Sequence, residues 1–288
     1  MTHTLVSAWT KARRTLEAAG VELPVFDARL LLEAATGVAR LDILTDPHRP
    51  IAEDAAARLD ALVARRAARE PVAYILGKKA FYAIDFAVGP AVLTPRPDTE
   101  MVVEAALAAL PVDAPARVLD LGVGSGAILL SILSARPLAS GIGVDASPEA
   151  LVFAESNAAA LGLTPRVVMH HGDWGAGVEG PFDLIVSNPP YIPTGDIPGL
   201  APEVSVHEPR LALDGGADGL AAYRRLWPDV ARLLKPGGRF CVEIGIGQGP
   251  DVSALARAAG LEVEAIKPDL AGIARVVLGR RPPAVAAG

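Results

Sequence analysis

The stretch "RVLDLGVGSGAILL" (residues 117–130) joins an apolar strand to a helix through three closely spaced glycines. Gly122, Gly124 and Gly126 allow positive φ angles and let a ligand approach the backbone closely. Their G-x-G-x-G spacing differs from the G-x-G-x-x-G of dinucleotide-binding loops, so a pyrophosphate is not the expected ligand. We therefore predict a ligand-binding loop at this strand-to-helix turn; a purely structural glycine-rich turn is the alternative.

Strands and helices alternate from about Ala116 onward. The expected strands are "RVLDLG", "SGIGVD", "RVVMH", "FDLIVS", "GRFCVEI", "LEVEAIKP" and "IARVVLGR". Such alternation predicts an α/β fold whose parallel sheet is covered on both faces. The last two strands are joined by too few residues for a crossover helix, so they should pair antiparallel. A parallel sheet with one reversed strand near its end resembles the class I methyltransferase variant of the Rossmann fold.

The first seventy residues show a different pattern of apolar residues. Apolar residues recur there at helical spacing, which predicts a small helical bundle domain over residues 1–70. The segment 71–97 contains short aromatic stretches interrupted by prolines, which predicts a β-hairpin linker. Residues 98–288 form the expected α/β domain. The last predicted helix carries Arg58, Arg65, Arg66 and Arg69. We expect a solvated basic face there; a surface that docks a partner is the alternative.

Composition narrows the function classes. The 288 residues carry a net charge of -6, with 51% apolar and 21% charged residues, which is ordinary for a globular protein. An acidic chain is a poor candidate for a protein that mainly grips nucleic acid phosphates. The single Cys241 lies in an apolar run and is expected to be a buried residue. The sequence shows no signal peptide, membrane-length apolar run or metal-ligand cluster, so we expect a cytoplasmic protein with no membrane association and no metal.

Two further strand ends carry polar residues. Asp145 ends the second strand of the α/β region, where a carboxylate can accept both ribose hydroxyls of a nucleoside. A helix cap before Ser147 is the alternative for Asp145. Asp173 and Trp174 end the third strand, where they are placed to hydrogen-bond to an adenine ring and to pack against it. Because ligands of open α/β sheets bind at the carboxyl ends of strands, these residues and the glycine loop together resemble an S-adenosylmethionine site.

The stretch "IVSNPPYI" (185–192) ends the fourth strand. It resembles the Asn-Pro-Pro-Tyr signature of methyltransferases that act on a planar nitrogen, either a base amine or a glutamine amide. The Asn188 side-chain oxygen and the Pro189 carbonyl could accept the two hydrogens of that nitrogen and orient it. Pro189 and Pro190 stiffen this geometry, and Tyr191 can pack on the flat target group. A general base at His170 or His171 is less favoured, because adjacent strand residues point to opposite faces.

The wider sequence resembles the HemK/PrmC family of protein-(glutamine) methyltransferases over roughly residues 5–280. The matching segments are "EPVAYILG" (70–77), "VLTPRPDTE" (92–100), "DLGVGSGAILL" (120–130), "VSNPPYI" (186–192) and "EPRLALDGGADGL" (208–220). The resemblance implies methyl transfer from S-adenosylmethionine to the glutamine of the Gly-Gly-Gln motif in peptide chain release factors. It also implies that the helical domain recognises the substrate, without direct nucleic acid binding, and we expect a monomer.

The resemblance also implies site residues. The cofactor would contact Gly122, Val123, Gly124, Ser125, Gly126, Asp145, Asp173, Trp174 and Asn188, and the substrate glutamine would be held by Asn188, Pro189, Pro190 and Tyr191. Arg96 and Glu100 would border the methyl-transfer site; alternatively they form a capping and salt-bridge pair where the helix begins at Pro97. Two other functions stay open at this point. One is methylation of amino groups on DNA or RNA bases, and the other is a non-catalytic, cofactor-binding adaptor.

Overall fold

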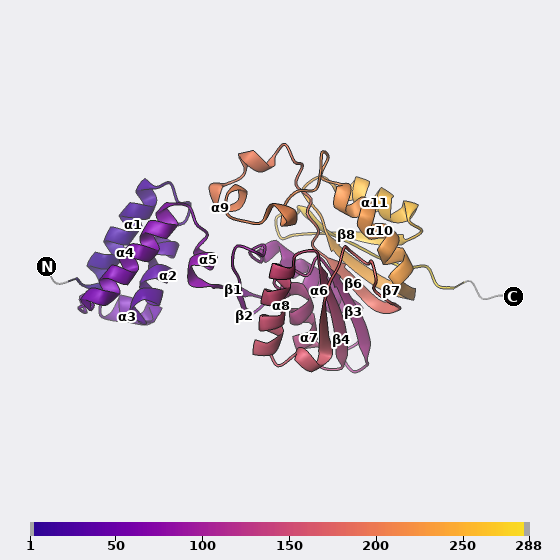
Figure 1. Ribbon diagram of the computed structural model, residues 1–288, viewed down its shortest axis with the longest axis horizontal. Coiled ribbons are helices and arrows are strands. Elements are labelled where there is room, and N and C mark those ends of the chain that lie inside the picture. The colour runs from indigo at the N-terminus through magenta and orange to yellow at the C-terminus, as the bar shows by residue number, and fades with distance from the viewer. Residues whose placement is uncertain (1–2, 285–288) are drawn as a thin grey trace. The chain divides into compact units, whose positions relative to one another are not determined.

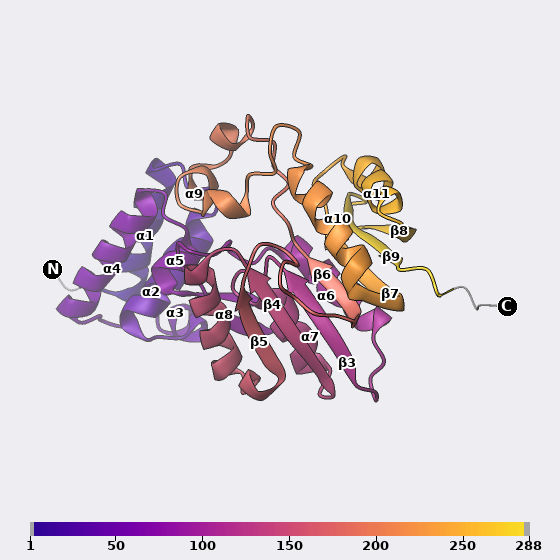
Figure 2. The same ribbon diagram turned by 45° about the vertical axis from the view of Figure 1, so that its right-hand side comes forward.

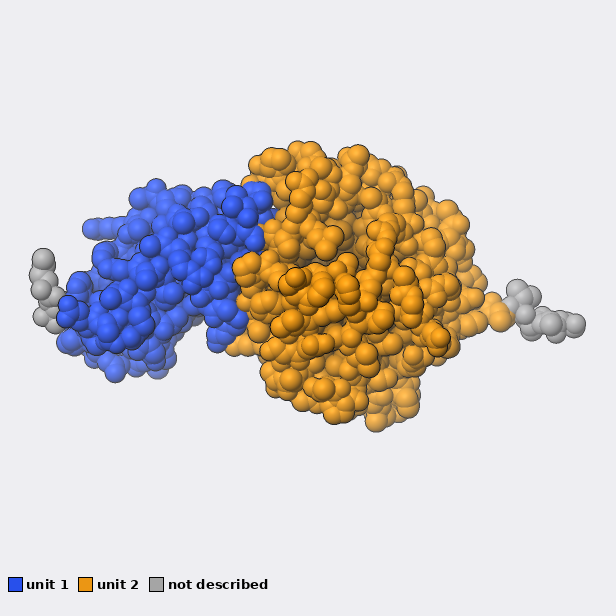
Figure 3. All heavy atoms as spheres, in the orientation of Figure 1, with its two compact units in different colours: residues 1–78, 201–207 blue, residues 79–200, 208–288 orange. Residues whose placement is uncertain are grey.

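The computed structural model describes residues 3–284, which fall into two compact units. The first comprises residues 3–78 together with Ala201–His207, and the second comprises Lys79–Leu200 together with residues 208–284 (Figure 3). A short segment from the middle of the α/β region therefore belongs with the helical unit, which the sequence did not suggest. The domain boundaries expected at residues 70 and 97 stay a prediction.

The first unit is a helical bundle (Figure 1). Its helices are α1 (Leu5–Ala18), α2 (Pro24–Thr36), α3 (Arg40–Thr45), α4 (Glu53–Ala67), α5 (Val72–Leu76) and the short α9 (Pro202–Ser205). A capping box of Thr4 and Ser7 starts α1, and Gly37 in a left-handed conformation ends α2. Fully buried leucines from α1 and α2, among them Leu16 and Leu31, form the centre of the bundle. The apolar stripes read from the sequence are thus the packed faces.

Arg66 contradicts the expectation that the arginines of this unit face solvent. Its side chain is buried, and its Nε donates to Asp27 Oδ2 at 2.7 Å while Nη1 lies 2.9 Å from Glu203 Oε1. Arg69 also donates to Glu203, through Nε at 2.7 Å and Nη2 at 2.6 Å. Burial alone would raise the pKa of Glu203, but the hydrogen bonds from Arg69 and Arg66 outweigh it and lower the pKa to about 2. These ion pairs hold α9 in the helical unit.

A β-hairpin begins the second unit. β1 (Lys78–Phe81) and β2 (Ile84–Ala87) are joined by Tyr82 and Ala83, both in the left-handed region. Asn157 fixes the hairpin, because its Oδ1 accepts from Ala87 N at 2.7 Å and its Nδ2 donates to Ala87 O at 3.0 Å. The same Nδ2 donates to Ser125 O at 2.9 Å. One buried amide therefore ties the hairpin to the glycine loop.

Within residues 3–284, seven strands form the main sheet in the order β5-β4-β3-β6-β7-β9-β8 (Figure 2). The strands are β3 (Ala116–Leu121), β4 (Ala139–Asp145), β5 (Val167–His171), β6 (Phe182–Ser187), β7 (Leu234–Glu243), β8 (Glu262–Pro268) and β9 (Ala274–Arg280). β9 runs antiparallel to both β7 and β8, whereas the pairs from β5 to β7 are parallel. The predicted class I methyltransferase architecture is confirmed.

Helices cover both faces of this sheet. On one face lie α6 (Glu100–Ala109), α7 (Ala127–Ala135) and α8 (Pro148–Ala160), and on the other lie α10 (Ala221–Leu233) and α11 (Gly249–Ala258). The core beneath α10 is aromatic, with Trp227 and Phe240 packed edge to face at 5.0 Å between ring centroids. Cys241 is buried, as expected. Among the described residues, no helix is long and apolar enough to cross a membrane.

Replacing Arg66 with methionine should destabilise the helical unit by about 3 to 5 kcal/mol, because the buried Asp27 and the partly buried Glu203 would each lose a partner. Chemical denaturation of the full chain, followed by circular dichroism, measures the change. Arg65→Met is the matched control, since Arg65 pairs with Glu70 in a more exposed bridge worth about 1 kcal/mol or less. Equal losses in the two variants would contradict the buried-pair interpretation.

Candidate active site

The glycine loop lies between β3 and α7, and its three glycines serve different purposes. Gly122, Gly124 and Gly126 have φ angles of 81°, 54° and 84°, all in the left-handed region. A Cβ added at Gly122 or Gly124 would meet nothing within 4 Å, whereas one at Gly126 would lie 2.8 Å from Leu130 Cδ1. The first two glycines therefore keep the backbone open to a ligand, and the third lets α7 pack.

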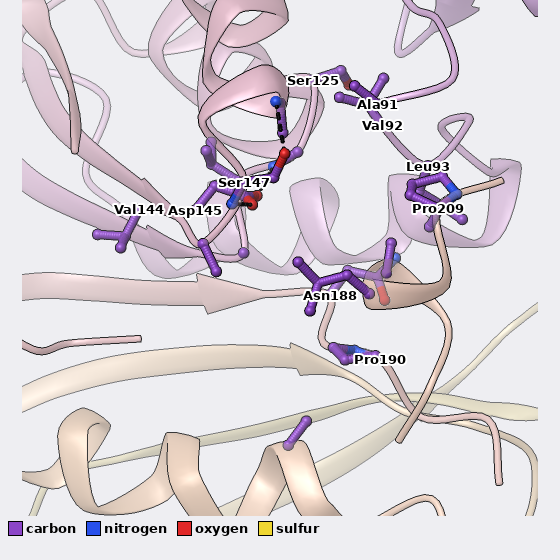
Figure 4. A pocket seen from close by; sticks show the side chains of 18 of the residues that line it. Ala91, Val92, Leu93, Ser125, Val144, Asp145, Ser147, Asn188, Pro190 and Pro209 are labelled. Carbon is purple, nitrogen blue, oxygen red and sulfur yellow. Dashed lines mark hydrogen bonds between the residues drawn. The ribbon is translucent and has the colours of Figure 1, made fainter. Parts of the chain in front are cut away.

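A cavity of about 480 Å³ lies beside this loop, at the carboxyl ends of the central strands (Figure 4). This volume falls within the range of small-molecule sites. Predicted site residues that line it are Gly122, Val123, Gly124, Ser125, Asp145, Asp173, Trp174, Asn188, Pro190 and Arg96. Gly126, Pro189, Tyr191 and Glu100, although described, are not among its lining residues. The strand-end residues expected to meet are thus mostly brought together.

Asp145 connects the glycine loop to the start of α8. Its Oδ2 accepts from Gly124 N at 2.8 Å, and its Oδ1 accepts from Ser147 N at 2.9 Å. The cap of α8 is Ser147, whose Oγ accepts from Ala150 N at 3.1 Å. Each carboxylate oxygen has a second lone pair, so Asp145 keeps the capacity to accept hydroxyl hydrogens from a ligand.

Asp173 and Trp174 follow β5 at the cavity wall. Asp173 forms an exposed ion pair with Arg225 of α10. Trp174 has a φ of 52°, a conformation that costs a non-glycine residue free energy and is common at functional sites. Its indole packs against the core beneath α10 and also lines the cavity, so it is positioned to pack against a flat ring.

The Asn-Pro-Pro-Tyr loop follows β6. Asn188 Nδ2 donates to Thr99 Oγ1 at 3.2 Å, and Thr99 also lines the cavity. The Tyr191 hydroxyl donates to Glu243 Oε1 at 3.2 Å, and burial, together with this carboxyl, raises the pKa of Tyr191 above its usual value. The phenol therefore reaches the end of β7, and its predicted packing on the target group stays a prediction.

Arg96 and Glu100 have different partners. Arg96 Nη2 donates to Glu208 Oε2 at 2.5 Å, and Thr94 N donates to the other oxygen of Glu208 at 3.3 Å. Glu100 Oε1 accepts from Tyr82 N at 2.9 Å. The structure thus does not show the alternative salt-bridge pair of Arg96 with Glu100, and their substrate contacts stay a prediction.

Thr99, Glu208, Glu243 and Gln248 lie at or near this site and were not among the residues predicted from the sequence. Gln248 Nε2 donates to Tyr191 O at 2.9 Å, and its Oε1 accepts from Gly245 N at 3.0 Å. Glu243 is 2% exposed, and burial raises its pKa to about 7 even though hydrogen bonds from Thr99 and Tyr191 act in the opposite direction. The signal that could have found Glu243 was available, because it ends a central strand just as Asp145 does.

Comparison with known proteins identifies the family. Residues 7–77 match the PrmC N-terminal domain, and residues 113–260 match a methyltransferase domain. A release factor glutamine methyltransferase from Caulobacter vibrioides is 55% identical over 98% of this chain and 98% of its own length. The chain belongs to the release factor glutamine methyltransferase family. The resemblance seen in the sequence is confirmed.

Other relatives agree. Proteins of the same name from Rhodospirillum rubrum and Moorella thermoacetica are 50% and 46% identical, covering 92% and 96% of this chain and 82% and 99% of their own lengths. A crystal structure of a methyltransferase from Pyrococcus furiosus superposes with a TM-score of 0.51 at 18% identity, covering 77% of this chain and 98% of that one. At that identity the likeness supports the fold alone.

The cavity residues fit S-adenosylmethionine, the cofactor of this methyltransferase. Gly122 and Gly124 leave the space that a side chain would fill, and the Asp145 carboxylate suits a ribose diol. Trp174 offers an aromatic face for the base. Asp145 and Trp174 are thus the residues that would select a nucleoside.

Asp145→Ala should weaken S-adenosylmethionine binding by about 2 to 4 kcal/mol, because hydrogen bonds from ribose hydroxyls to a carboxylate are lost. Isothermal titration calorimetry on the folded variant measures the change. Glu155→Ala, which removes an exposed carboxylate from α8, is the control and should bind normally. Unchanged affinity in the Asp145 variant would refute the ribose assignment.

Proposed function

We propose that this enzyme transfers a methyl group from S-adenosylmethionine to the side-chain amide nitrogen of the glutamine in the Gly-Gly-Gln motif of peptide chain release factors. The observation that carries the proposal is that Asn188 and the glycine loop line one cavity. The chain that forms this cavity is 55% identical, over 98% of both lengths, to a release factor glutamine methyltransferase. Protein-glutamine methylation is therefore favoured over base methylation or a non-catalytic adaptor.

The chemistry requires help from the protein, because the amide lone pair is delocalised and the nitrogen is a poor nucleophile. When bound, S-adenosylmethionine supplies a methyl group activated by a sulfonium sulfur. Asn188 Oδ1 and the Pro189 carbonyl accept the two N–H groups of the glutamine, which orients its nitrogen and draws charge toward it. Pro189 and Pro190 restrict the backbone of the loop, so the two acceptors are fixed before the substrate arrives.

The wider setting follows from the substrate. Release factors work in translation termination, so we place the enzyme in the cytoplasm. The net charge of -6 argues against a duplex or RNA substrate, which would call for a basic groove. We propose that the enzyme acts as a monomer. The helical unit, which matches the PrmC N-terminal domain, is the proposed docking surface for the release factor.

Asn188→Ala should lower the methylation rate by about 10² or more, because the side-chain acceptor that positions the amide is lost. Steady-state kinetics on a purified release factor measures the rate, and calorimetry on the same variant reports cofactor affinity. Affinity should fall much less than the rate. Near-normal turnover would show that Asn188 merely ends a strand.

An intact release factor should be methylated efficiently, whereas a short free peptide with the same Gly-Gly-Gln sequence should be methylated poorly. The glutamine amide is neutral and offers few anchoring groups, so binding energy from elsewhere on a folded partner is needed to position it. Labelled cofactor gives both rates, and mass spectrometry locates the added methyl group. Equal rates would refute docking, while label on nucleic acid but not on release factor would overturn the proposed function.

A further inference from the structure

Two segments of the chain have no role in the chemistry proposed above, although both resemble segments of the family. We call them the TPRP segment (residues 92–100) and the EPRL segment (residues 208–220). Lining residues that they supply to the cavity include Leu93, Pro95, Arg96, Pro209, Leu211 and Ala212 (Figure 4). The glycine loop, Asp145 and Trp174 instead follow β3, β4 and β5. The two segments therefore form a part of the cavity wall distinct from the residues proposed to hold the cofactor.

Glu208 joins the two segments. Its side chain is only 1% exposed, and each of its carboxyl oxygens has a partner in the TPRP segment. Arg96 Nη2 donates to Oε2 at 2.5 Å, and Thr94 N donates to Oε1 at 3.3 Å. A buried carboxyl group is costly unless both its oxygens are paired, so Glu208 holds the TPRP segment where these donors reach it.

The EPRL segment is also bonded to the Asn-Pro-Pro-Tyr loop. Ile192 N donates to Leu213 O at 3.0 Å, and Gly215 N donates back to Ile192 O at 2.8 Å. A Cβ added at Gly215 would lie only 2.9 Å from Pro190 O, so the two backbones approach closely there. The EPRL segment therefore packs directly against the loop that carries Asn188.

The TPRP segment completes a ring of hydrogen-bonded segments, because Asn188 Nδ2 donates to Thr99 Oγ1 at 3.2 Å. From Asn188 the ring runs along its loop to the EPRL segment, then through Glu208 to the TPRP segment, and through Thr99 back to Asn188. Loss of any one link would leave an open series of loops, whose ends could move apart. The position of Asn188 thus depends on a link that Asn188 itself does not touch.

We infer that Glu208 is a positioning residue whose buried carboxyl closes this ring and so holds Asn188 and the surrounding cavity wall in place for methyl transfer. The inference rests on the proposed function, in which Asn188 orients the glutamine amide. A displacement of about 1 Å in such a group can lower a rate by about 10². The glycine loop and Asp145 are not members of the ring, so cofactor binding should depend on it little.

Glu208→Gln tests the inference, because the side chain keeps its shape but has one oxygen where there were two. It can accept from Arg96 or from Thr94 N, but not from both. We expect kcat on a release factor to fall roughly 10- to 100-fold, with S-adenosylmethionine affinity changed less than about threefold. An unchanged kcat, or a loss of cofactor affinity as large as the loss of kcat, would overturn the inference.

Glu262→Gln is the control for the same replacement, since it alters an exposed carboxylate paired with Arg280 and should leave kcat unchanged. Arg96→Met opens the link at Glu208 from the other side and should lower kcat at least as far as Glu208→Gln does. The double variant Arg96→Met/Glu208→Gln should be no slower than the slower single variant, because the two changes open the same link. Fully additive losses would show that the two residues act separately and would contradict the inference.

Hydrogen–deuterium exchange of the full chain, followed by mass spectrometry, gives a readout independent of turnover. In Glu208→Gln, backbone amides should exchange faster in the TPRP segment and also across the ring at Ile192, whereas the glycine loop should be unchanged. Glu262→Gln should alter neither region. Faster exchange confined to the TPRP segment would show a merely local contact and overturn the inference. Because no release factor is present, failure of the wild-type enzyme to methylate one would count against the proposed function alone.

Discussion

Parallel pairing of neighbouring strands is the constraint on which the site depends. β3, β4, β6 and β7 run in the same direction, so their carboxyl ends meet at one edge of the sheet. Each of these ends carries a polar group or an open loop: the glycine loop, the Asp145 carboxylate, the Asn188 amide and the Glu243 carboxyl group. A change of strand order or direction would separate them, whatever the sequence of each loop.

Two of the acids near this edge are held where water cannot solvate them. Burial raises the pKa of Asp120, in β3, to about 8 and that of Glu243 to about 7. In the folded state these carboxyls hold their protons to a higher pH than in the unfolded chain, so the stability they contribute falls as pH rises from about 4 to about 8. These two buried acids thus lower the free energy of unfolding near neutral pH, as titratable groups at functional sites often do.

Much of the site could be predicted from sequence because local patterns encode it. The glycine loop, Asp145 and Asn188 are each visible within one strand and the turn after it, and the strand-end rule brings them together. Glu243 was missed although its position at the end of a central strand is visible in the sequence, whereas Thr99 was missed because its partner Asn188 lies far away in sequence and only the folded chain brings the two together. Arg66 escaped for a similar reason. A cation near a helix end is predicted to face solvent unless its partners in the folded chain, here Asp27 and Glu203, are known.

The assignment of Ala201–His207 to the helical unit has a consequence for how the protein can be rearranged. Within the described chain, the backbone passes between the units at three places: after Lys78, after Leu200 and after His207. The helical unit is therefore joined to the rest of the chain by three connections and not by a single linker. Exchange of this unit with that of a relative would have to graft α9 and its Glu203 along with the amino-terminal helices. If only the amino-terminal helices were exchanged, the residues at positions 66 and 69 would face an α9 segment from a different protein.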